Sequence, residues 1–425
     1  MKKLIFIVVT LCIFTVTPFT CIEVYYRLTT QDKPEQRYEK INQRPVTVTP
    51  ELGMIFAPNQ YTTRSNGYDY HVKQKSNKFG FLDRDHDLEK PEGVYRILFL
   101  GDSYIEAVQV AIKDKVHSIL ERKLNEKRMP KKVECIALGF SGFGTANQLL
   151  YYENLGKKFN PDLVVVLFIA NDFMNNSPIL HGINEGWYPY KAPRFFFEYD
   201  HKKNQFITVP HVLDSYKYMI PVKAPPKKKE IPLATDKWLS WSLFYKESRS
   251  VLKEYLGREE MQEKIDDIYT QRFKFLKDNY PFIKEKLEDW NYPKDLGLNT
   301  MYYAEKMPQV FEESMKLTDL CFSELKRRTA ENKSKLIIAS GTFFKNGNIE
   351  PEKYGRKCDP DGFFKKLKKL TDKHSIPLID LYEEFLKRGT IEETRWRYDS
   401  HFNKTGHRWA ADAIQDYIVK ENLIQ

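Results

Sequence analysis

The stretch Ile97-Leu98-Phe99-Leu100-Gly101-Asp102-Ser103-Tyr104 joins a short apolar run to a glycine turn, and an amphipathic segment from Glu106 to Leu124 follows it. An apolar run, a tight turn and a periodic segment predict a buried strand, a turn and a helix. This order places the Ser103 hydroxyl at the carboxyl end of a parallel sheet, where ligands bind in open α/β proteins. Because Asp and Ser also favour helix N-caps, a purely structural role for Asp102 or Ser103 is the alternative interpretation.

The alternation of apolar runs and helical patterns continues on both sides of a long interruption. The expected strands are residues 96–100, 133–138, 162–169, 335–340 and 376–381, and the expected helices are residues 111–127, 146–155, 362–373 and 404–419. Near-continuous apolar strands indicate a parallel sheet that is buried on both faces. Strands separated by helices imply right-handed crossovers. We therefore predict an α/β fold, a three-layer α/β/α sandwich of the flavodoxin-like kind with a central parallel five-stranded sheet.

The N-terminal part of the chain lies outside this pattern. Lys2 and Lys3 precede an apolar stretch of residues 4–24, which has the length that a membrane-spanning helix requires. We expect residues 1–25 to be an uncleaved anchor or transmembrane helix, with a cleaved signal peptide as the alternative. The two lysines would keep the N-terminus in the cytoplasm and place the bulk of the chain in the periplasm or outside the cell.

The remaining segments complete the expected domain organisation. We expect residues 26–51 to be a tether and residues 52–93 to be an extension packed on the core. The core would come in two parts, residues 94–176 and 301–425. Residues 177–300 are rich in aromatic residues, lysine and proline, and two segments among them, 238–256 and 259–277, have helical patterns. Because an insertion of this length needs structure of its own, we predict an inserted lid or substrate-shaping subdomain, with a packing insertion as the alternative.

Composition narrows the possible functions. The chain has 425 residues and a net charge of +10, but its basic residues are spread along the sequence. The densest run, Lys227-Lys228-Lys229, follows two prolines and is typical of an exposed linker, so we predict no nucleic-acid partner. The five cysteines have neither metal-ligand spacing nor a disulfide framework, and the sequence leaves open a single disulfide that involves Cys358. We therefore predict no metal site and no cofactor, and the sequence gives no prediction of oligomeric state.

Four loops carry small or polar residues directly after predicted strands or before the last helix. They are residues 101–103, 139–145, 170–172 and 399–401. Loops at one end of a parallel sheet converge, so these loops would supply a hydroxyl, backbone N–H groups, a side-chain amide and an imidazole beside a carboxylate. Acyl-transfer chemistry requires a nucleophile, a base with an orienting partner, and fixed donors for an oxyanion.

The four loops, in this order, resemble the four sequence blocks of the SGNH hydrolase superfamily, the GDSL-like lipases and esterases. Gly101-Asp102-Ser103 is similar to the first block, Ser141-Gly142 to the second, Asn171-Asp172 to the third and Asp399-Ser400-His401 to the last. The resemblance covers about residues 96–176 and 307–419. The N-terminal stretch is similar to that of membrane-anchored bacterial members.

The resemblance implies a role for each matching residue. Ser103 would be the nucleophile, His401 the general base, and Asp399 the group that orients and stabilises the imidazole. The Ser103 N–H, the Gly142 N–H and the Asn171 side chain would form the oxyanion hole, in which one buried donor is worth roughly 3–4 kcal/mol of transition-state stabilisation.

Some residues depart from the family pattern or compete with these assignments. One residue, Ser400, separates the aspartate from the histidine in place of the usual two, and Ala137-Leu138 occupies the place of the usual asparagine before the glycine turn. The rival histidine, His407, lies in the last predicted helix, where we expect a structural role. We expect Asp102 and Asp172 to make loop hydrogen bonds rather than to bind a metal.

These observations favour a serine-dependent acyl-ester hydrolase or O-acyltransferase that acts outside the cytoplasmic membrane through an acyl-enzyme on Ser103. The expected substrate is an acylated carbohydrate, such as an O-acyl group of an envelope glycan, or another ester. One alternative is a lipid esterase, since the N-terminal helix would hold the domain near a membrane. The other is a catalytically silent glycan-binding or scaffold protein that retains the fold.

Overall fold

The computed structural model describes residues 18, 20–25, 39–127, 129–185, 196–200, 205–209, 269–278, 281–292, 297–341 and 356–425. The chain divides into two compact units, residues 1–37 with 221–271 and residues 38–220 with 272–425. In the first unit the described residues, 18, 20–25 and 269–271, are helical. Across the described ranges no helix combines the length and apolar character needed to cross a membrane. Most of the predicted anchor, residues 1–25, lies outside these ranges.

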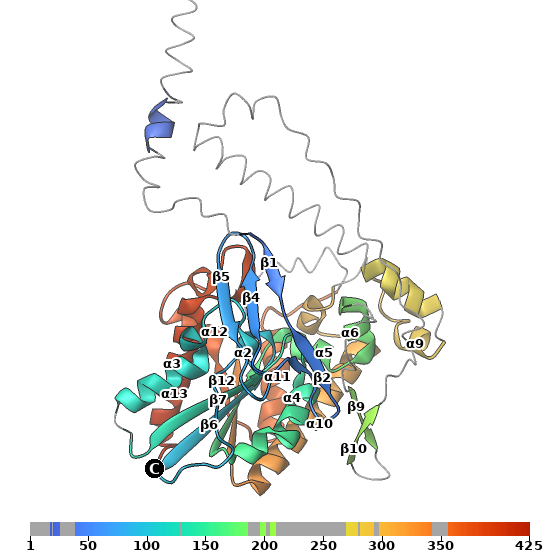
Figure 1. The fold of residues 1–425 in the computed structure, drawn as a ribbon. Coiled ribbons are helices and arrows are strands. Elements are labelled where there is room, and N and C mark those ends of the chain that lie inside the picture. Colours follow the sequence, from blue (N-terminus) through green and yellow to red (C-terminus); the bar gives the residue numbers. More distant parts are fainter. Residues whose placement is uncertain are drawn as a thin grey trace, which may run out of the picture. The chain divides into compact units, whose positions relative to one another are not determined.

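A five-stranded parallel sheet forms the centre of the second unit (Figure 1). Its strands lie in the order β12-β11-β8-β6-β7, and each is parallel to its neighbours. They are β6 (Val94–Gly101), β7 (Lys132–Gly139), β8 (Leu163–Phe168), β11 (Lys335–Ser340) and β12 (Leu378–Asp380). The predicted parallel sheet is therefore confirmed.

Two predicted elements differ from the structure for local reasons. The strand predicted at residues 376–381 ends at Asp380, because that side chain accepts the N–H groups of Tyr382 and Glu383 and so starts helix α12 (Leu381–Leu386). The helix predicted at residues 111–127 begins at Val116, after a 3-10 turn over Ile112–Asp114.

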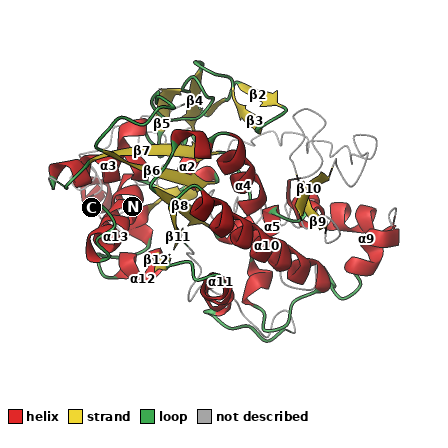
Figure 2. Ribbon diagram, turned by 90° about the horizontal axis from the view of Figure 1, so that it is seen from below, coloured by secondary structure: helices red, strands yellow, loops and turns green. Residues whose placement is uncertain are grey.

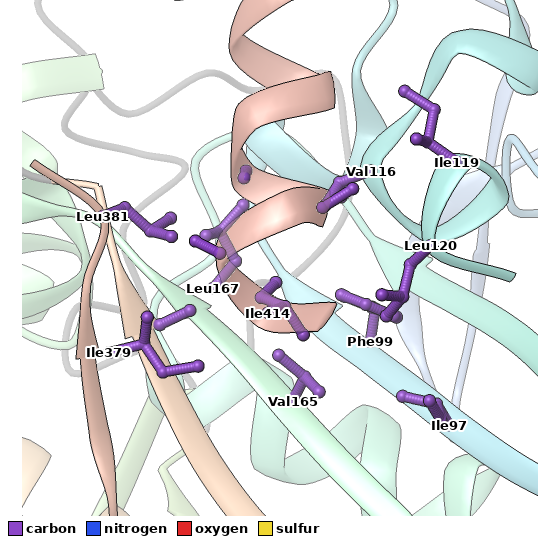
Figure 3. Close-up of a cluster of buried hydrophobic side chains, with 14 of the residues drawn as sticks. Ile97, Phe99, Val116, Ile119, Leu120, Val165, Leu167, Ile379, Leu381 and Ile414 are labelled. Carbon is purple, nitrogen blue, oxygen red and sulfur yellow. The ribbon is translucent and has the colours of Figure 1, made fainter. Parts of the chain in front are cut away.

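Helices cover both faces of the sheet (Figure 2). The core cluster joins β6, β8 and β11 to α3 (Val116–Glu126), α12 and α13 (Lys404–Lys420) on one face. Figure 3 shows the centre of this cluster, where Phe99 and Val165 lie beside Ile414 of α13 and Leu120 of α3. On the other face, Phe168 packs against Phe322 of α10 (Gln309–Glu331) and Phe363 of α11 (Gly362–Lys373). Helix α4 (Thr145–Asn154) also covers this face.

Residues 39–93 form small antiparallel sheets at the start of the second unit. One sheet has the order β1-β4-β5, from β1 (Ile41–Gln43), β4 (Tyr61–Ser65) and β5 (His71–Lys75). A second pairs β2 (Val46–Thr49) with β3 (Gly53–Phe56). The tether predicted at residues 26–51 thus contains β1 and β2, since backbone pairing with β4 and β3 orders this part of it.

Strand β7 is the last strand of the central sheet, and side chains occupy N–H groups on its outer edge. Glu121 accepts from Cys135 at 2.7 Å, Asn125 from Val133 at 2.9 Å, and Asp83 from Ala137 at 2.9 Å. An edge strand with free backbone groups invites pairing with another chain, and these side chains block it.

Parts of the predicted insertion, residues 177–300, are described. They include α6 (Pro178–Glu185), the hairpin of β9 (Phe196–Asp200) and β10 (Gln205–Val209), a helical segment at residues 269–278, and α9 (Pro281–Lys286). The helix predicted at residues 238–256 lies outside the described residues.

Candidate active site

The nucleophile candidate lies where β6 ends. Gly101 is the last residue of β6, and Ser103 is the first residue of α2 (Ser103–Glu106). Asp102 is the N-cap of this short helix and accepts the Tyr104 N–H at 3.0 Å. Asp102, and not Ser103, is therefore the residue that caps the helix. The Ser103 hydroxyl is available to bind another partner.

That partner is His401, on the hairpin that precedes the last helix. The hairpin pairs β13 (Arg395–Trp396) with β14 (Asp399–Phe402). The Ser103 Oγ lies 2.8 Å from His401 Nε2, and His401 Nδ1 lies 2.5 Å from Asp399 Oδ1. Asp399 Oδ1 also accepts the His401 backbone N–H at 3.0 Å. The structure thus brings together the three residues predicted as nucleophile, base and orienting acid.

This arrangement determines the imidazole tautomer. Ionised Asp399 can only accept, so His401 donates its Nδ1–H to the carboxylate and leaves Nε2 as an acceptor for the Ser103 hydroxyl. Burial lowers the pKa of His401, but the hydrogen bond and charge of Asp399 outweigh it, and the pKa is raised above its usual value. Burial raises the pKa of Asp399, but His401 and Tyr70 outweigh it, and the pKa is held well below its usual value.

The third block lies beside the nucleophile. Asn171, in α5 (Ala170–Asn175), donates its side-chain amide to Asp102 Oδ2 at 2.8 Å, and the Ser103 hydroxyl is 3.5 Å from the same oxygen. Asp102 therefore connects the predicted oxyanion-hole amide to the nucleophile loop. Asp172 accepts the Ile169 N–H at 2.7 Å and the Gln148 amide at 2.8 Å. Both aspartates make local hydrogen bonds, as predicted, but Asp172 lies in helix α5 and not in the loop predicted at residues 170–172. Its side chain accepts the Ile169 N–H and so helps to start this helix.

The second block forms the turn between β7 and α4. Gly142 has a φ of 72°, a left-handed conformation that glycine adopts without strain. The preceding Ser141 donates its N–H to the carboxylate of Glu106, the last residue of α2. Glu106 is buried and lies 2.8 Å from the guanidinium of Arg44. The turn that carries Gly142 is thus connected directly to the helix that carries Ser103, and the oxyanion-hole role of Gly142 and Asn171 stays a prediction.

The structure adds residues that the sequence analysis missed. The Tyr70 hydroxyl donates to Asp399 Oδ2 at 2.7 Å, and Gln109 donates to the same oxygen at 3.4 Å. The ring of Tyr104 lies 5.1 Å from that of His401, and its hydroxyl donates to the Ser400 carbonyl at 3.1 Å. Nothing in the sequence pattern pointed to Tyr70. Glu106 could have been noticed from the sequence, because it is an acidic residue among apolar residues directly after Ser103.

The rival histidine has a structural environment. His407 is buried in α13, with its ring 5.6 Å from that of Phe402. Burial, with a smaller contribution from the charge of Lys115, lowers the pKa of His407 to about 3, so it is neutral at physiological pH. In the part of the chain that the structure describes, no three histidine, cysteine or acidic side chains are grouped in a way that could hold a metal ion.

Comparison with known proteins finds solved structures whose folds are similar to that of this chain. No family model and no curated protein matches the chain. Similar solved structures include the acetyl xylan esterase AlAXEase, with 14% identity, a TM-score of 0.34, and coverage of 76% of this chain and 99% of that chain. A lipase/acylhydrolase from Enterococcus faecalis has 12% identity, a TM-score of 0.34, and coverage of 77% and 96%. A member of the lipolytic protein G-D-S-L family from Veillonella parvula has 12% identity, a TM-score of 0.32, and coverage of 77% and 99%.

These solved structures are what the chain is similar to, and at such identities and TM-scores we take no functional assignment from them. The chain's own features extend its resemblance to the SGNH hydrolases. The five-stranded parallel sheet has the predicted architecture, and the segments that directly follow β6, β7 and β8 carry the first three blocks. The last block lies on the hairpin before α13.

Proposed function

We propose that the protein is a serine-dependent acyl-ester hydrolase or O-acyltransferase that works through an acyl-enzyme on Ser103. The observation that carries the proposal is the continuous hydrogen-bonded chain from Ser103 Oγ through His401 to Asp399, with separations of 2.8 Å and 2.5 Å. A serine hydroxyl is a weak nucleophile unless a base removes its proton as it attacks. Here that base is in hydrogen-bond contact with the hydroxyl, and the base itself is oriented.

The geometry supports a two-step reaction. Ser103 Oγ attacks the ester carbonyl as its proton moves to His401 Nε2, and the resulting imidazolium is stabilised by ionised Asp399. Collapse of the tetrahedral intermediate breaks the bond to the alcohol, which leaves with the proton from His401. A water or a sugar hydroxyl then attacks the acyl-enzyme, with His401 again taking the proton, and Ser103 is regenerated. Hydrolysis and acyl transfer differ only in this acceptor.

We further propose that the substrate is an O-acyl group of an envelope glycan and that the protein acts outside the cytoplasmic membrane. The support comes from the sequence. The apolar N-terminal stretch preceded by Lys2 and Lys3 favours an anchor with the bulk of the chain beyond the membrane. A net charge of +10 suits an anionic envelope surface.

Labelling and turnover test the proposed chemistry. We expect a fluorophosphonate probe to modify wild-type protein on Ser103, and p-nitrophenyl acetate to be turned over by it. Ser103→Ala should lose both reactions while its circular dichroism spectrum stays that of the wild type. Ser400→Ala is the matched control, because Ser400 is exposed and its contact with Tyr104 uses only the backbone carbonyl. A folded wild-type protein that neither labels nor turns over an ester would favour a silent binding protein.

A second experiment separates the two acceptors and tests the substrate. Wild-type protein is supplied with an O-acetylated glycan, and free acetate is measured against acetyl transfer to an added unacetylated sugar. Transfer that increases with sugar concentration supports an acyltransferase, whereas acetate alone supports a hydrolase. Turnover of p-nitrophenyl acetate without any reaction on the glycan contradicts the glycan proposal and leaves the serine chemistry standing.

A further inference from the structure

The turn between β4 and β5 contacts the hairpin that carries Asp399. Within this turn, Asn66 Oδ1 accepts the N–H groups of Tyr68 at 3.0 Å and Asp69 at 2.8 Å, and Asp69 Oδ2 accepts the Asn66 amide at 2.9 Å. Its own side chains therefore fix the turn. The direction of the next residue, Tyr70, is set by this local structure.

The turn is also held against residues next to Asp399. Asp69 Oδ2 accepts the Tyr398 N–H at 2.8 Å, and the rings of Tyr70 and Trp396 lie 5.4 Å apart. These contacts join the N-terminal extension to Trp396 of β13 and to Tyr398 in the connection between β13 and β14. The position of Tyr70 relative to Asp399 thus depends on contacts other than their shared hydrogen bond.

The two oxygens of the Asp399 carboxylate accept hydrogen bonds from different residues. Oδ1 accepts from the ring and the backbone of His401, whereas Oδ2 accepts from Tyr70 at 2.7 Å and from Gln109 at 3.4 Å. Tyr70 is therefore the closer donor on the oxygen that His401 does not use. Tyr70 is buried, with 4% of its surface exposed, so water has little access to replace it there. Burial and the charge of Asp399 raise the pKa of Tyr70, which keeps its hydroxyl protonated at neutral pH.

We propose that Tyr70 is a positioning residue for the reaction: its hydroxyl fixes the Asp399 carboxylate in the orientation in which Oδ1 receives the Nδ1–H of His401. This inference rests on the proposed function, since it acts through the same Ser103, His401 and Asp399. The N-terminal extension then belongs to the catalytic structure as well as to the packing of the fold. Holding a catalytic group by contacts behind it preserves the geometry that the reacting atoms need.

Removal of the Tyr70 hydroxyl has a defined consequence for His401. The hydrogen bond and the charge of Asp399 raise the pKa of His401, and the hydrogen bond joins Oδ1 to Nδ1. Because Tyr70 holds the carboxylate in this orientation, loss of its hydroxyl weakens the contact, and the pKa of His401 should fall. The other charged groups that act on His401 are Asp102 and Glu106, and Arg64 acts on the Tyr70 hydroxyl. The substitution of Tyr70 leaves all three in place.

Tyr70→Phe tests the proposal, because it keeps the ring contact with Trp396 and removes the hydroxyl. We expect kcat for p-nitrophenyl acetate to fall roughly ten- to a hundredfold, the range for loss of a hydrogen bond to a charged group. KM should change little, and the acid limb of the pH profile of kcat/KM should move to lower pH. In an Asp399→Ala background, Tyr70→Phe should cause no further loss, because Tyr70 acts through Asp399.

Tyr68→Phe is the matched control, since Tyr68 lies in the same turn and is 61% exposed. It should leave kcat and the pH profile unchanged. The proposal is overturned if folded Tyr70→Phe retains the wild-type kcat and acid limb, if the acid limb moves to higher pH, or if Tyr70→Phe costs the same activity with and without Asp399.

A readout without turnover separates this proposal from the proposed function. The pKa of the His401 imidazole is measured by NMR titration in wild type and Tyr70→Phe, with its signal assigned by its loss in His401→Gln. A lower pKa in Tyr70→Phe supports the role of Tyr70 even if wild-type protein turns over no ester, a result that would contradict the proposed function alone. An unchanged or higher pKa contradicts the role of Tyr70 whatever the activity.

Discussion

At the scale of single residues, the proposed function makes the pH dependence of activity a property of the His401–Asp399 pair. The base must be neutral to take the Ser103 proton, and its pKa lies above the usual 6.5 because Asp399 outweighs the effect of burial. We therefore expect kcat/KM for p-nitrophenyl acetate to rise with pH through a limb centred above pH 6.5. An acid limb centred below 6.5 would contradict the environment described for His401.

Asp399→Asn tests the same pair by substitution. An asparagine can donate to His401 Nδ1, which favours the tautomer that cannot accept the Ser103 proton at Nε2. We expect kcat to fall by about three to four orders of magnitude, as for triads in which this exchange leaves the geometry intact. Steady-state kinetics at the pH optimum measures the loss. A fall of less than tenfold would show that the acid has another identity.

The three residues of the hydrogen-bonded chain from Ser103 to Asp399 could be found from the sequence at this scale, because each lies in a short local pattern. Ser103 follows a strand and a glycine, and His401 and Asp399 are two positions apart. Tyr70 could not, since 329 positions separate it from Asp399 and only the folded chain brings the two together. Tertiary contacts decide which side chain donates to a carboxylate, and the periodicity of a sequence does not reveal these contacts.

At the scale of elements, α2 and the turn between β7 and α4 are joined through Glu106. Its carboxylate accepts the Ser141 N–H next to Gly142, and Arg44, which lies 5.0 Å from the Phe140 ring centre, balances its charge. Removing one partner of a buried ion pair leaves an uncompensated charge, which destabilises the fold strongly. Variants that test Glu106 must therefore neutralise Arg44 as well.

A pair of double variants isolates the acceptor on Glu106. Arg44→Met with Glu106→Gln keeps an oxygen for the Ser141 N–H, whereas Arg44→Met with Glu106→Leu removes it. We expect kcat of the leucine variant to be about 10²-fold lower than that of the glutamine variant, the loss typical of one misplaced oxyanion donor. KM should be similar in the two. Equal kcat values would exclude a role for Glu106 in placing the turn.

At this scale, the accuracy with which a helix or strand could be predicted from the sequence depended on its length and on its hydrophobic pattern. Long apolar strands such as β8 were predicted within a residue or two, because burial on both faces leaves little ambiguity. Element ends were harder, as at β12, where one side chain, Asp380, changes the backbone from strand to helix. The strands β1 and β2 were missed because short antiparallel strands acquire their stability from partners elsewhere in the chain.

At the scale of the whole molecule, a buried charged cluster joins the extension to the core. His86 lies 3.1 Å from Asp83 and 2.7 Å from Glu134, and Arg96 donates to Glu134 at 2.7 Å. Because both ring nitrogens of His86 face carboxylates, only the protonated ring can donate to both. Burial lowers the pKa of His86, but its two carboxylate partners outweigh this and raise it above its usual value.

His86 should therefore stabilise the fold most at low pH. A histidine whose pKa is raised by folding contributes its full stabilisation below the unfolded-state value of about 6.5, and the contribution is lost as pH rises through the folded-state value. We expect the loss of unfolding free energy in His86→Gln to be largest near pH 5.5 and smaller at pH 8.5. Urea unfolding of both proteins across this range measures it. A loss that is independent of pH would contradict the charged form.

The separation of the catalytic residues along the chain has a consequence for synthesis. Ser103 and His401 are 298 positions apart, so at roughly 5–20 residues per second a ribosome needs about 15–60 s to make the second after the first. During that interval the nascent chain has Ser103 but lacks the His401 that the proposed mechanism requires, so on that mechanism it turns over no ester. Ester turnover would therefore report, in real time, that synthesis has passed His401 and that the chain has folded so that this residue reaches Ser103.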